Sequence, residues 1–453
     1  MSKPSIPRGT RDFSPNVMAK RKYIINIIET VYKSFGFMPL ETPAMENLTT
    51  LTGKYGDEGD QLVFKILNSG DYLKEVNEAD FNISNYKKLT SQISEKGLRY
   101  DLTVPLARYV VMNQNDVSFP FKRYQIQPVW RADRPQKGRY REFWQCDADV
   151  LGTSSLLCEA DFIAIYQQVF EKLGLKEYEI RINHRKLIEA VVEKADASEH
   201  FKTITVIIDK ADKIGIDSVK KELITIGLSE NQSDIILSLL NKHALNQAAI
   251  NQLQAALPDT ESAQKAISDL NMLLNLLTNN ATNVYLDGSL ARGLDYYTGC
   301  IFEVVPTQVA IGSISGGGRY DDLTGVFGLK GISGIGISFG IDRLYDVMET
   351  LSLFPDGNNT FTDILFCPMD ENALVYCMPL ATALRLEGYK VEVYPTAAKL
   401  KKQLDYANSK HILWAAIVGE TELKDEKVAL KNLLSGEQLI VFKTEIGGYL
   451  KDN

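Results

Sequence analysis

Two alternating runs of residues, 121–130 and 141–150, constrain the fold of this chain more than any other part of the sequence. Their apolar members are Tyr124, Ile126 and Trp130 in the first run and Trp144, Cys146, Ala148 and Val150 in the second. The opposite sides carry Arg123, Gln125 and Gln127, and Arg141, Phe143, Gln145, Asp147 and Asp149. A period of two is typical of β-strands with one face in a core. A polar loop joins the runs, which therefore predict a long antiparallel hairpin.

The residues before the hairpin predict a helix and then an extended segment. Ser14 followed by Pro15 is typical of a helix start, because the hydroxyl can accept a hydrogen bond from a free backbone N–H and proline fits the first turn. Gly36 is typical of a helix end, so we expect a helix over about residues 15–35. Residues 37–43 should be extended, because each of their two prolines restricts the residue before it.

The rest of the chain predicts three further parts. Residues 68–96 are polar and rich in Asn, Ser and Lys, which indicates a surface insertion of unknown role. Residues 185–282 carry apolar residues at helical spacing and predict a largely helical inserted domain. Strands are expected at 301–305 and 332–339, and a composition change at 355–359 precedes a tail of alternating strands and helices. The expected tail elements are strands 363–367, 391–393 and 412–418 and helices 371–386 and 400–410, together a separate α/β domain.

Composition excludes several classes of protein. A hydrophobic content of 45% with 24% charged residues is typical of soluble globular chains and argues against disordered or fibrous ones. No apolar run approaches the roughly 18–20 residues of a membrane span, and the first residues lack the apolar core of a signal peptide. These features predict a soluble cytoplasmic protein without a membrane partner.

The cysteines and histidines argue against a structural metal site. The five cysteines form an odd set without a C-x-x-C pair, which indicates unpaired thiols in a reducing compartment. The four histidines are far apart in the sequence and lack the spacing of ligand pairs. We therefore expect no metal to be held by protein ligands alone.

Positive charge is concentrated in the hairpin. The net charge of -8 argues against a surface built throughout for nucleic acid. Residues 121–141 nevertheless carry seven cations and one acid, Asp133. The cations are Lys122, Arg123, Arg131, Arg134, Lys137, Arg139 and Arg141. Any polyanion binding is expected there.

Two segments place polar side chains together in a way that fits a ligand pocket. Gln145 and Asp149 share one face of the second hairpin strand, and Arg131 at the loop's entrance offers a guanidinium suited to phosphate. A solvated sheet surface would show the same alternation. Residues 290–299 contain a Tyr-Tyr pair before a glycine, which suggests a pocket wall. Arg292 and Asp295 in that segment can also be an ordinary local ion pair.

Two glycine-rich runs could let a ligand approach the backbone. Residues 315–322 contain three consecutive glycines but no Walker loop, and a flexible turn is the alternative. In residues 334–343, Gly334, Gly336 and Ser338 would leave one strand face bare, which could admit a flat ring such as a purine. Arg343 would then lie in the first turn of the next helix, where anions are favoured. Close packing of the strand and helix is the alternative.

Five segments together resemble a known family. Residues 131–145 resemble motif 2 and residues 334–343 motif 3 of the class II aminoacyl-tRNA synthetases. Residues 292–297 (Arg-Gly-Leu-Asp-Tyr-Tyr) resemble the signature peculiar to histidyl-tRNA synthetases, and residues 316–321 (Gly-Gly-Gly-Arg-Tyr-Asp) resemble its companion. Residues 7–13 (Pro-Arg-Gly-Thr-Arg-Asp-Phe) resemble the family's opening. The chain is thus identified as a member of the histidyl-tRNA synthetase family.

The resemblance implies an α+β architecture, with an antiparallel catalytic sheet flanked by helices. The implied domains are the first catalytic part at 1–184, a helical insertion at 185–282, the second catalytic part at 283–355 and an α/β anticodon-binding domain at 360–453. Motifs 1 and 2 and the polar insertion near 68–96 fall in the first part, and the histidine signatures and motif 3 in the second. Pro43 matches the dimer-forming motif 1, which implies a homodimer.

The resemblance also implies a reaction and its residues. ATP with Mg²⁺ would activate L-histidine to histidyl-adenylate and pyrophosphate, and histidine would pass to the 3′ end of its tRNA. The implied histidine-binding residues are Asp101, Leu102, Thr103, Arg131, Gln145, Asp149, Arg292, Tyr296 and Tyr297. The implied ATP-binding residues are Arg131, Asp133, Arg139 and Arg343, with Gln136 and Lys137 at the tRNA acceptor end. Arg292 and Arg131 are the implied catalytic residues, since preorganised cations at the phosphate would drive the displacement.

The sequence departs from the family's common bacterial pattern in two places. Residues 99–103 (Arg-Tyr-Asp-Leu-Thr) resemble the archaeal and eukaryotic variant, so the substrate amino group would meet Asp101. The polar stretch at 68–96 is longer than expected. Two other functions remain as alternatives: a synthetase-like regulatory subunit of histidine biosynthesis, and a tRNA-binding module without activation chemistry.

Overall fold

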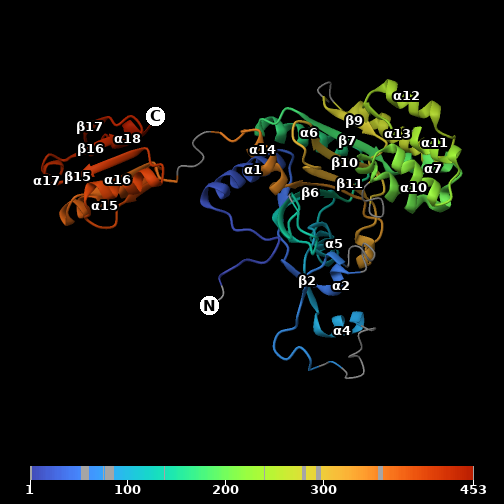
Figure 1. Cartoon of the computed structure of the whole chain (residues 1–453), viewed down its shortest axis with the longest axis horizontal. Helices are drawn as coiled ribbons and strands as arrows, with labels where there is room; N and C mark the ends of the chain where they lie inside the picture. The colour runs from blue at the N-terminus through green and yellow to red at the C-terminus, as the bar shows by residue number, and fades with distance from the viewer. Residues whose placement is uncertain are drawn as a thin grey trace. The chain divides into compact units, whose positions relative to one another are not determined.

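The chain folds into two compact units, Met1–Phe354 and Pro355–Asn453 (Figure 1). The computed structural model describes residues 3–52, 61–74, 76, 86–136, 138–238, 240–277, 282–291, 297–355 and 361–451. Each unit has a hydrophobic core of its own. No helix among these described residues is long and apolar enough to cross a membrane.

A nine-stranded, mostly antiparallel sheet forms the centre of the first unit. Its strand order is β1-β5-β6-β12-β11-β10-β7-β9-β8. The strands are β1 (Met38–Pro39), β5 (Phe121–Trp130), β6 (Glu142–Leu151), β12 (Gly334–Gly340), β11 (Ser315–Tyr320), β10 (Cys300–Pro306), β7 (Tyr178–His184), β9 (Val284–Asp287) and β8 (Lys242–Ala244). The antiparallel sheet expected from the sequence is therefore present, with the hairpin strands β5 and β6 paired along their whole length.

Three helices cover one face of this sheet: α1 (Pro15–Ser34), α6 (Leu157–Leu173) and α14 (Ile341–Thr350). Cys146 and Ala148 of β6 are fully buried against them, as the alternation predicts. The opposite face of β6 turns Gln145, Asp147 and Asp149 toward a cavity. The helix predicted at 15–35 is confirmed, and the Ser14 hydroxyl accepts a hydrogen bond from the backbone N–H of Val17 at 3.5 Å.

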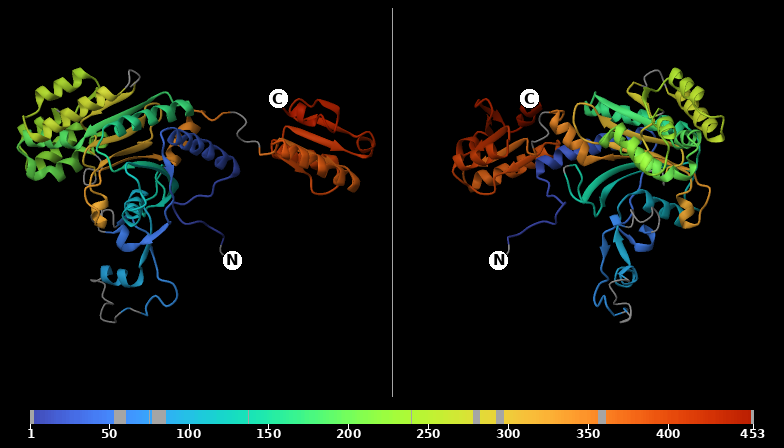
Figure 2. Two further views of the ribbon diagram at one scale, coloured as in Figure 1. Left: turned by 180° about the vertical axis from the view of Figure 1, so that it is seen from behind. Right: turned by 45° about the vertical axis from the view of Figure 1, so that its right-hand side comes forward.

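A small second sheet, ordered β2-β4-β3, packs against helix α2, and Glu46 of β2 forms an ion pair with Arg108 of α5. Its strands are β2 (Met45–Asn47), β4 (Lys96–Leu98) and β3 (Lys65–Ile66), and the nearby helices are α2 (Leu48–Leu51) and α5 (Thr103–Met112). The polar stretch near 68–96 contains helix α4 (Tyr86–Ile93), which projects away from the main sheet in Figures 1 and 2. Only residues 68–74, 76 and 86–96 of that stretch are described.

The segment predicted to be largely helical contains helices and one short strand. Its helical elements are α7 (Arg185–Lys194), η3 (Ser198–His200), α8 (Phe201–Ile208), α9 (Ala211–Ile214), α10 (Ile216–Thr225), α11 (Glu230–Ser238), α12 (Gln247–Ala256) and α13 (Glu261–Leu276). Strand β8 was not expected, and it extends the main sheet by pairing with β9. Its three residues are too short for an alternation to identify them.

The glycine run at 316–318 lies in strand β11 between β10 and β12, so the alternative of a flexible turn is wrong. A Cβ atom at Gly317 would come within 2.1 Å of the carbonyl oxygen of Gly336. Glycine is needed at position 317 because the backbone of β12 leaves no space for a Cβ atom there. Beyond it, the short 3₁₀ helix η4 (Thr324–Phe327) leads toward β12.

The second unit is a five-stranded sheet ordered β14-β13-β15-β16-β17. The alternation predicted for the tail is confirmed by β13 (Ile364–Pro368), α15 (Glu371–Leu386), β14 (Val391–Val393), α16 (Leu400–Ser409) and β15 (Trp414–Val418). The last elements of this unit were not predicted from the sequence: α17 (Glu420–Lys424), β16 (Lys427–Asn432), β17 (Gln438–Phe442) and α18 (Ile446–Lys451). Strands β16 and β17 run antiparallel to their neighbours, whereas β13, β14 and β15 are parallel.

Candidate functional site

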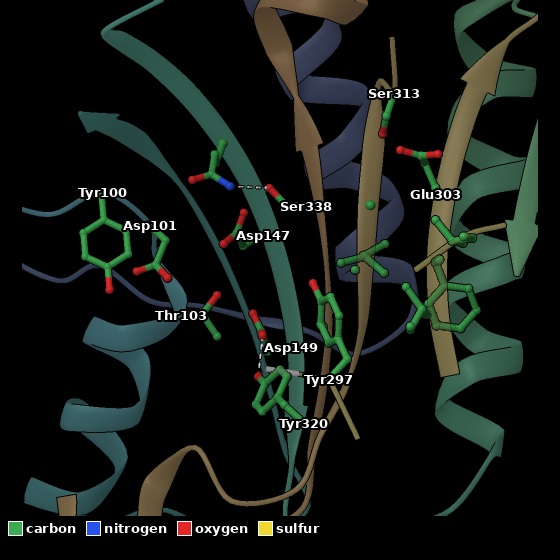
Figure 3. Close-up of a pocket in the computed structure, with 18 of the residues that line it drawn as sticks. Tyr100, Asp101, Thr103, Asp147, Asp149, Tyr297, Glu303, Ser313, Tyr320 and Ser338 are labelled. Carbon is green, nitrogen blue, oxygen red and sulfur yellow. Dashed lines mark hydrogen bonds between the residues drawn. The ribbon is translucent and has the colours of Figure 1, made fainter. Parts of the chain in front are cut away.

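A cavity of about 400 Å³ opens on the face of the main sheet opposite α1, α6 and α14 (Figure 3). Six residues singled out from the sequence line it: Asp101, Thr103, Arg131, Gln145, Asp149 and Tyr297. They come from the start of α5 and the residues before it, from the end of β5, from strand β6 and from the segment before β10. Residues distant in the sequence thus meet at one polar site.

Asp149 is held at the base of the cavity by two partners. Tyr320 of β11 donates its hydroxyl proton to Oδ1 of Asp149 at 2.5 Å. The guanidinium of Arg123 on β5 lies 2.8 Å from Oδ2, and both charged side chains are buried. Burial raises the pKa of Asp149, while the Arg123 charge and the Tyr320 hydrogen bond oppose that rise. Arg123 is therefore a buried counter-ion and not part of the polyanion-binding surface expected for the hairpin cations.

Glycines in β12 make room for these side chains. Gly336 lies opposite Asp149 in the strand register, and a Cβ there would come within 2.1 Å of the Asp149 carboxylate. A Cβ at Gly334 would meet the Tyr320 ring at 2.3 Å. The strip expected to lie bare for a flat ligand is thus largely filled by protein side chains. Gly336 and Ser338 still line the cavity.

Asp101 and Arg131 form a second charged part of the wall. Burial raises the pKa of Asp101 to about 6, against the opposing charge of Arg131. Arg131 donates from Nε to the Tyr100 carbonyl at 2.9 Å, and its guanidinium lies 5.0 Å from the centre of the Phe143 ring. Among the described residues, no hydrogen bond occupies the two terminal nitrogens of Arg131, which therefore remain available to an anionic ligand.

Six polar residues that line the cavity were not chosen from the sequence as site residues: Tyr100, Asp147, Glu303, Ser313, Tyr320 and Ser338. Gln145 donates from Nε2 to the Ser338 hydroxyl at 2.8 Å. Asp147 lies between Gln145 and Asp149 on the same strand face, so the alternation already placed it in the site. Glu303 could not be found from sequence, because only strand pairing brings β10 beside this cavity.

Arg343 and the hairpin loop lie beside the cavity. Arg343 donates from Nε to the Gly138 carbonyl at 3.1 Å and from a terminal nitrogen to the Ser313 carbonyl at 2.6 Å. It therefore connects the loop to Ser313, which lines the cavity. In the loop, Asp133 and Arg139 approach to 3.7 Å, and Gln136 pairs with Arg139 through the backbone.

The amino-terminal segment packs on the same loop. The Arg11 guanidinium lies 3.3 Å from the centre of the Tyr140 ring and forms an ion pair with Asp342 of α14. Arg21 of α1 binds the same carboxylate at 2.6 Å. The carbonyl of Gly9 accepts a hydrogen bond from the N–H of Arg141 at 2.9 Å. The loop is therefore held between the amino-terminal segment and the start of α14.

The remaining predicted site residues do not line the cavity or cannot be placed. The Leu102 side chain is fully buried away from the cavity, and its carbonyl accepts a hydrogen bond from Arg123 at 3.2 Å. Arg292, Asp295, Tyr296 and Lys137 lie outside the described residues. Within the described part of the chain, no three His, Cys, Asp or Glu side chains are arranged to hold a metal ion.

Comparison with known proteins identifies the family. A family model described as histidyl-tRNA synthetase matches residues 71–344, which is more than half of the chain. The chain belongs to the histidyl-tRNA synthetase family. A second model, described as an anticodon binding domain, matches residues 363–453 of this synthetase-family chain. The resemblance drawn from the sequence motifs is thereby confirmed.

Relatives within the histidyl-tRNA synthetase family match almost the whole chain. Proteins named histidine–tRNA ligase from Christiangramia forsetii and Cytophaga hutchinsonii are 52% and 49% identical, over 453 and 449 residues. These alignments cover at least 98% of this chain and 99% of each relative.

Two solved structures show the same fold. The histidyl-tRNA synthetase from Nostoc sp. PCC 7120 has a TM-score of 0.83 and 29% identity, covering 100% of both chains. A Bacillus halodurans protein described as an ATP phosphoribosyltransferase regulatory subunit/histidyl-tRNA synthetase has a TM-score of 0.73 and 21% identity, covering 90% of this chain and 97% of its own. At 21% identity, the match to the Bacillus halodurans protein shows a shared fold and nothing more specific.

Proposed function

We propose that this chain is a histidine–tRNA ligase, which activates L-histidine with ATP and transfers it to the 3′ end of its tRNA. The observation that carries the proposal is the polar cavity, where Asp101, Arg131, Gln145 and Asp149 meet in a chain about half identical to ligases of that name. Both substrates fit the charges of this cavity. Carboxylates suit the amino group and ring N–H of histidine, and Arg131 suits a phosphate.

Each part of the cavity would bind one part of the substrates. Asp149 would accept the imidazole N–H while the Tyr297 hydroxyl binds the other ring nitrogen, and Asp101, Thr103 and Gln145 would hold the amino group. The free nitrogens of Arg131 would hold the α-phosphate. Arg343, joined to Ser313 at the cavity and to Gly138 of the loop, would support the rest of ATP.

The chemistry needs positioned cations and no protein nucleophile. The histidine carboxylate displaces pyrophosphate at the α-phosphorus, and fixed positive charge stabilises the negative charge that develops there. Arg131 and Arg292 would supply that charge. Mg²⁺ takes most of its ligands from phosphates and water, so it would enter with ATP and need few protein ligands.

The second unit would bind the tRNA anticodon, since it matches the anticodon-binding model over residues 363–453. Gln136 and Lys137 of the hairpin loop would meet the acceptor end. We propose a homodimer from the match of Pro43 to motif 1. The five buried cysteines lack a disulfide, which supports a reducing cytoplasmic location.

Exchange of labelled pyrophosphate into ATP tests the activation step. Exchange should depend on L-histidine and be absent with other amino acids, and transfer RNA for histidine should become charged in the complete reaction. A regulatory subunit or a tRNA-binding module would give no histidine-dependent exchange. Such a result with folded protein would contradict the proposal.

A further inference from the structure

Three aspartates and one arginine, Arg131, line the same cavity. Asp101, Asp147 and Asp149 all line the cavity, and Asp147 and Asp149 are almost fully buried. Figure 3 shows Asp101, Thr103 and Asp147 around one part of the cavity and Asp149, Tyr297 and Tyr320 around another. The two parts therefore have different surroundings.

The negative charge of the Asp149 carboxylate is already balanced by protein groups. Arg123 pairs with its Oδ2 and Tyr320 donates to its Oδ1. Asp147 is not balanced in this way, because its buried Oδ1 has no hydrogen-bond partner. Buried carboxylate oxygens normally have partners, so an unpartnered one at a cavity wall points to a ligand.

The charged groups around Asp147 do not neutralise it. The positive groups that act on it are Arg123 and Arg99, and the negative ones are Asp101 and Asp149. The Ser338 hydroxyl from β12 favours its ionised form, while Tyr32 and Cys146 lie near it from the helical side of the sheet. Arg131 opposes the charge of Asp101, and Glu303 of β10 also lines the cavity. With Asp149 paired to Arg123 and Asp101 opposed by Arg131, the charge of Asp147 remains for a cation on the ligand.

Burial and neighbouring acids raise the pKa of both aspartates. Burial raises the pKa of Asp147 to about 7 and that of Asp101 to about 6, and the charge of Asp149 contributes to both rises. A bound ammonium group would lower both values, because an opposite charge favours the ionised form. Near neutral pH, cation binding would therefore drive a proton into solvent.

We propose that Asp147 is a specificity-determining residue that holds the α-ammonium group of the substrate together with Asp101, and that the pair releases a proton to solvent when the substrate binds. This inference rests on the proposed function and adds to it a residue and a proton. No covalent bond forms or breaks except the carboxyl O–H, whose proton passes to water. A histidine analogue that lacks the α-ammonium group would leave the proton on Asp147 and Asp101.

Calorimetry with the full chain at pH 6.5 tests the inference. Titrations of L-histidine and of imidazolepropionate, which lacks the ammonium group, are run in two buffers of different ionisation enthalpy to count protons. Histidine should release about one proton more from the protein than imidazolepropionate, because Asp147 and Asp101 together hold about one proton at this pH. The α-ammonium group of histidine lowers the pKa of its own imidazole ring, so the ring pKa of each ligand is measured by titration and its ring proton is subtracted from the count. Equal corrected proton counts for the two ligands would overturn the proposal without any variant.

Single-residue variants test whether Asp147 is the group that releases the proton. Asp147→Asn should bind histidine at least about tenfold more weakly and lose the extra proton, while its affinity for imidazolepropionate stays within about twofold. Asp161→Asn is the matched control: this acid pairs with Lys122 outside the cavity, so both affinities and both proton counts should stay unchanged. Equal loss of both ligands in Asp147→Asn would indicate a structural role and overturn the proposal.

The same experiment separates this inference from the proposed function. If the parent chain shows histidine-dependent pyrophosphate exchange but Asp147→Asn keeps the parent's affinity and proton release, the inference is wrong and the ligase function stands. If the parent neither binds histidine nor exchanges pyrophosphate, the proposed function itself is wrong. The two failures are distinguished by the exchange assay.

Discussion

Asp149 is the residue whose surroundings best fit recognition of the imidazole ring. Its carboxylate is fixed by Tyr320 and Arg123, so it cannot turn away from a ligand that lacks the matching N–H. A buried polar group left without its partner costs about 1–3 kcal/mol, which favours histidine over other amino acids. Recognition would therefore depend on hydrogen bonding more than on size.

Removing the Asp149 carboxylate should weaken the binding of histidine and leave the binding of ATP nearly unchanged. We expect Asp149→Ala to raise the apparent KM for histidine in pyrophosphate exchange by at least about tenfold, with the KM for ATP nearly unchanged. Tyr297→Phe should have a smaller effect in the same direction, because it removes one hydroxyl. If Asp149→Ala keeps the parent's histidine KM and its discrimination against other amino acids, the ring is recognised elsewhere.

Asp147 should make the ligand-free protein less stable as pH rises. Its pKa is about 7 in the folded chain, above the usual value of 3.8, so the folded state keeps the proton longer than the unfolded state does. The destabilisation should therefore grow between about pH 4 and pH 7 and stay constant above. Asp147→Asn should have a higher melting temperature than the parent at pH 8 and a smaller gain at pH 5. An equal gain at both pH values would show that the carboxylate is not the cause.

At the scale of single residues, the sequence predicted which side chains of residues 141–150 share a face, but not which residues of other strands contact them. The period of two in residues 141–150 placed Gln145, Asp147 and Asp149 together, because alternation depends only on local geometry. Arg123 and Tyr320 could not be assigned to Asp149, since their meeting depends on the register of three separate strands. The bare strip expected at Gly334 and Gly336 was filled for the same reason.

At the scale of elements, the amino-terminal segment and α14 together hold the hairpin loop. Arg11 stacks on Tyr140 of the loop and pairs with Asp342, which also accepts a hydrogen bond from the backbone N–H of Trp144 at 3.3 Å. Neighbouring Arg343 binds the Gly138 carbonyl. Since the loop carries basic residues proposed to meet ATP and tRNA, its position should depend on these contacts.

Loss of Arg11 should loosen the loop. We expect Arg11→Ala to raise the KM for ATP several-fold in pyrophosphate exchange, with a smaller change in the KM for histidine. Trypsin should also cleave faster after Arg139, whose side chain is half exposed, because a loosened loop fits a protease active site more readily. Arg8→Ala, which changes an exposed arginine of the same segment, is the control and should behave like the parent. Unchanged cleavage and ATP use in Arg11→Ala would show that the segment does not hold the loop.

The elements themselves were largely predictable where the signals are local. Helix α1 has a Ser-Pro start, and the strands and helices of the tail alternate with clear polar breaks. Strands β16 and β17 were missed because they follow a short helix and pair antiparallel at the end of a parallel sheet. The antiparallel catalytic sheet was implied by the family resemblance, but its nine-strand order was not predicted, because strand order depends on contacts distant in sequence.

At the scale of the whole molecule, each of the two units has its own core and its own proposed role. The cavity and every residue that lines it belong to Met1–Phe354, and the match to the anticodon-binding model lies within Pro355–Asn453. Histidine activation should therefore need only the first unit, whereas tRNA recognition should need both.

A chain that ends at Phe354 tests this division. It should keep histidine-dependent pyrophosphate exchange within a few-fold of the full chain, because the cavity and its supporting core are intact. Charging of tRNA should fall by at least about 100-fold at limiting tRNA, since a second binding site that adds contacts to the same tRNA is lost. Circular dichroism and the oligomeric state of the shortened chain control for misfolding. If it charges tRNA as well as the full chain does, the second unit does not bind the anticodon; if folded protein loses exchange as well, activation depends on both units.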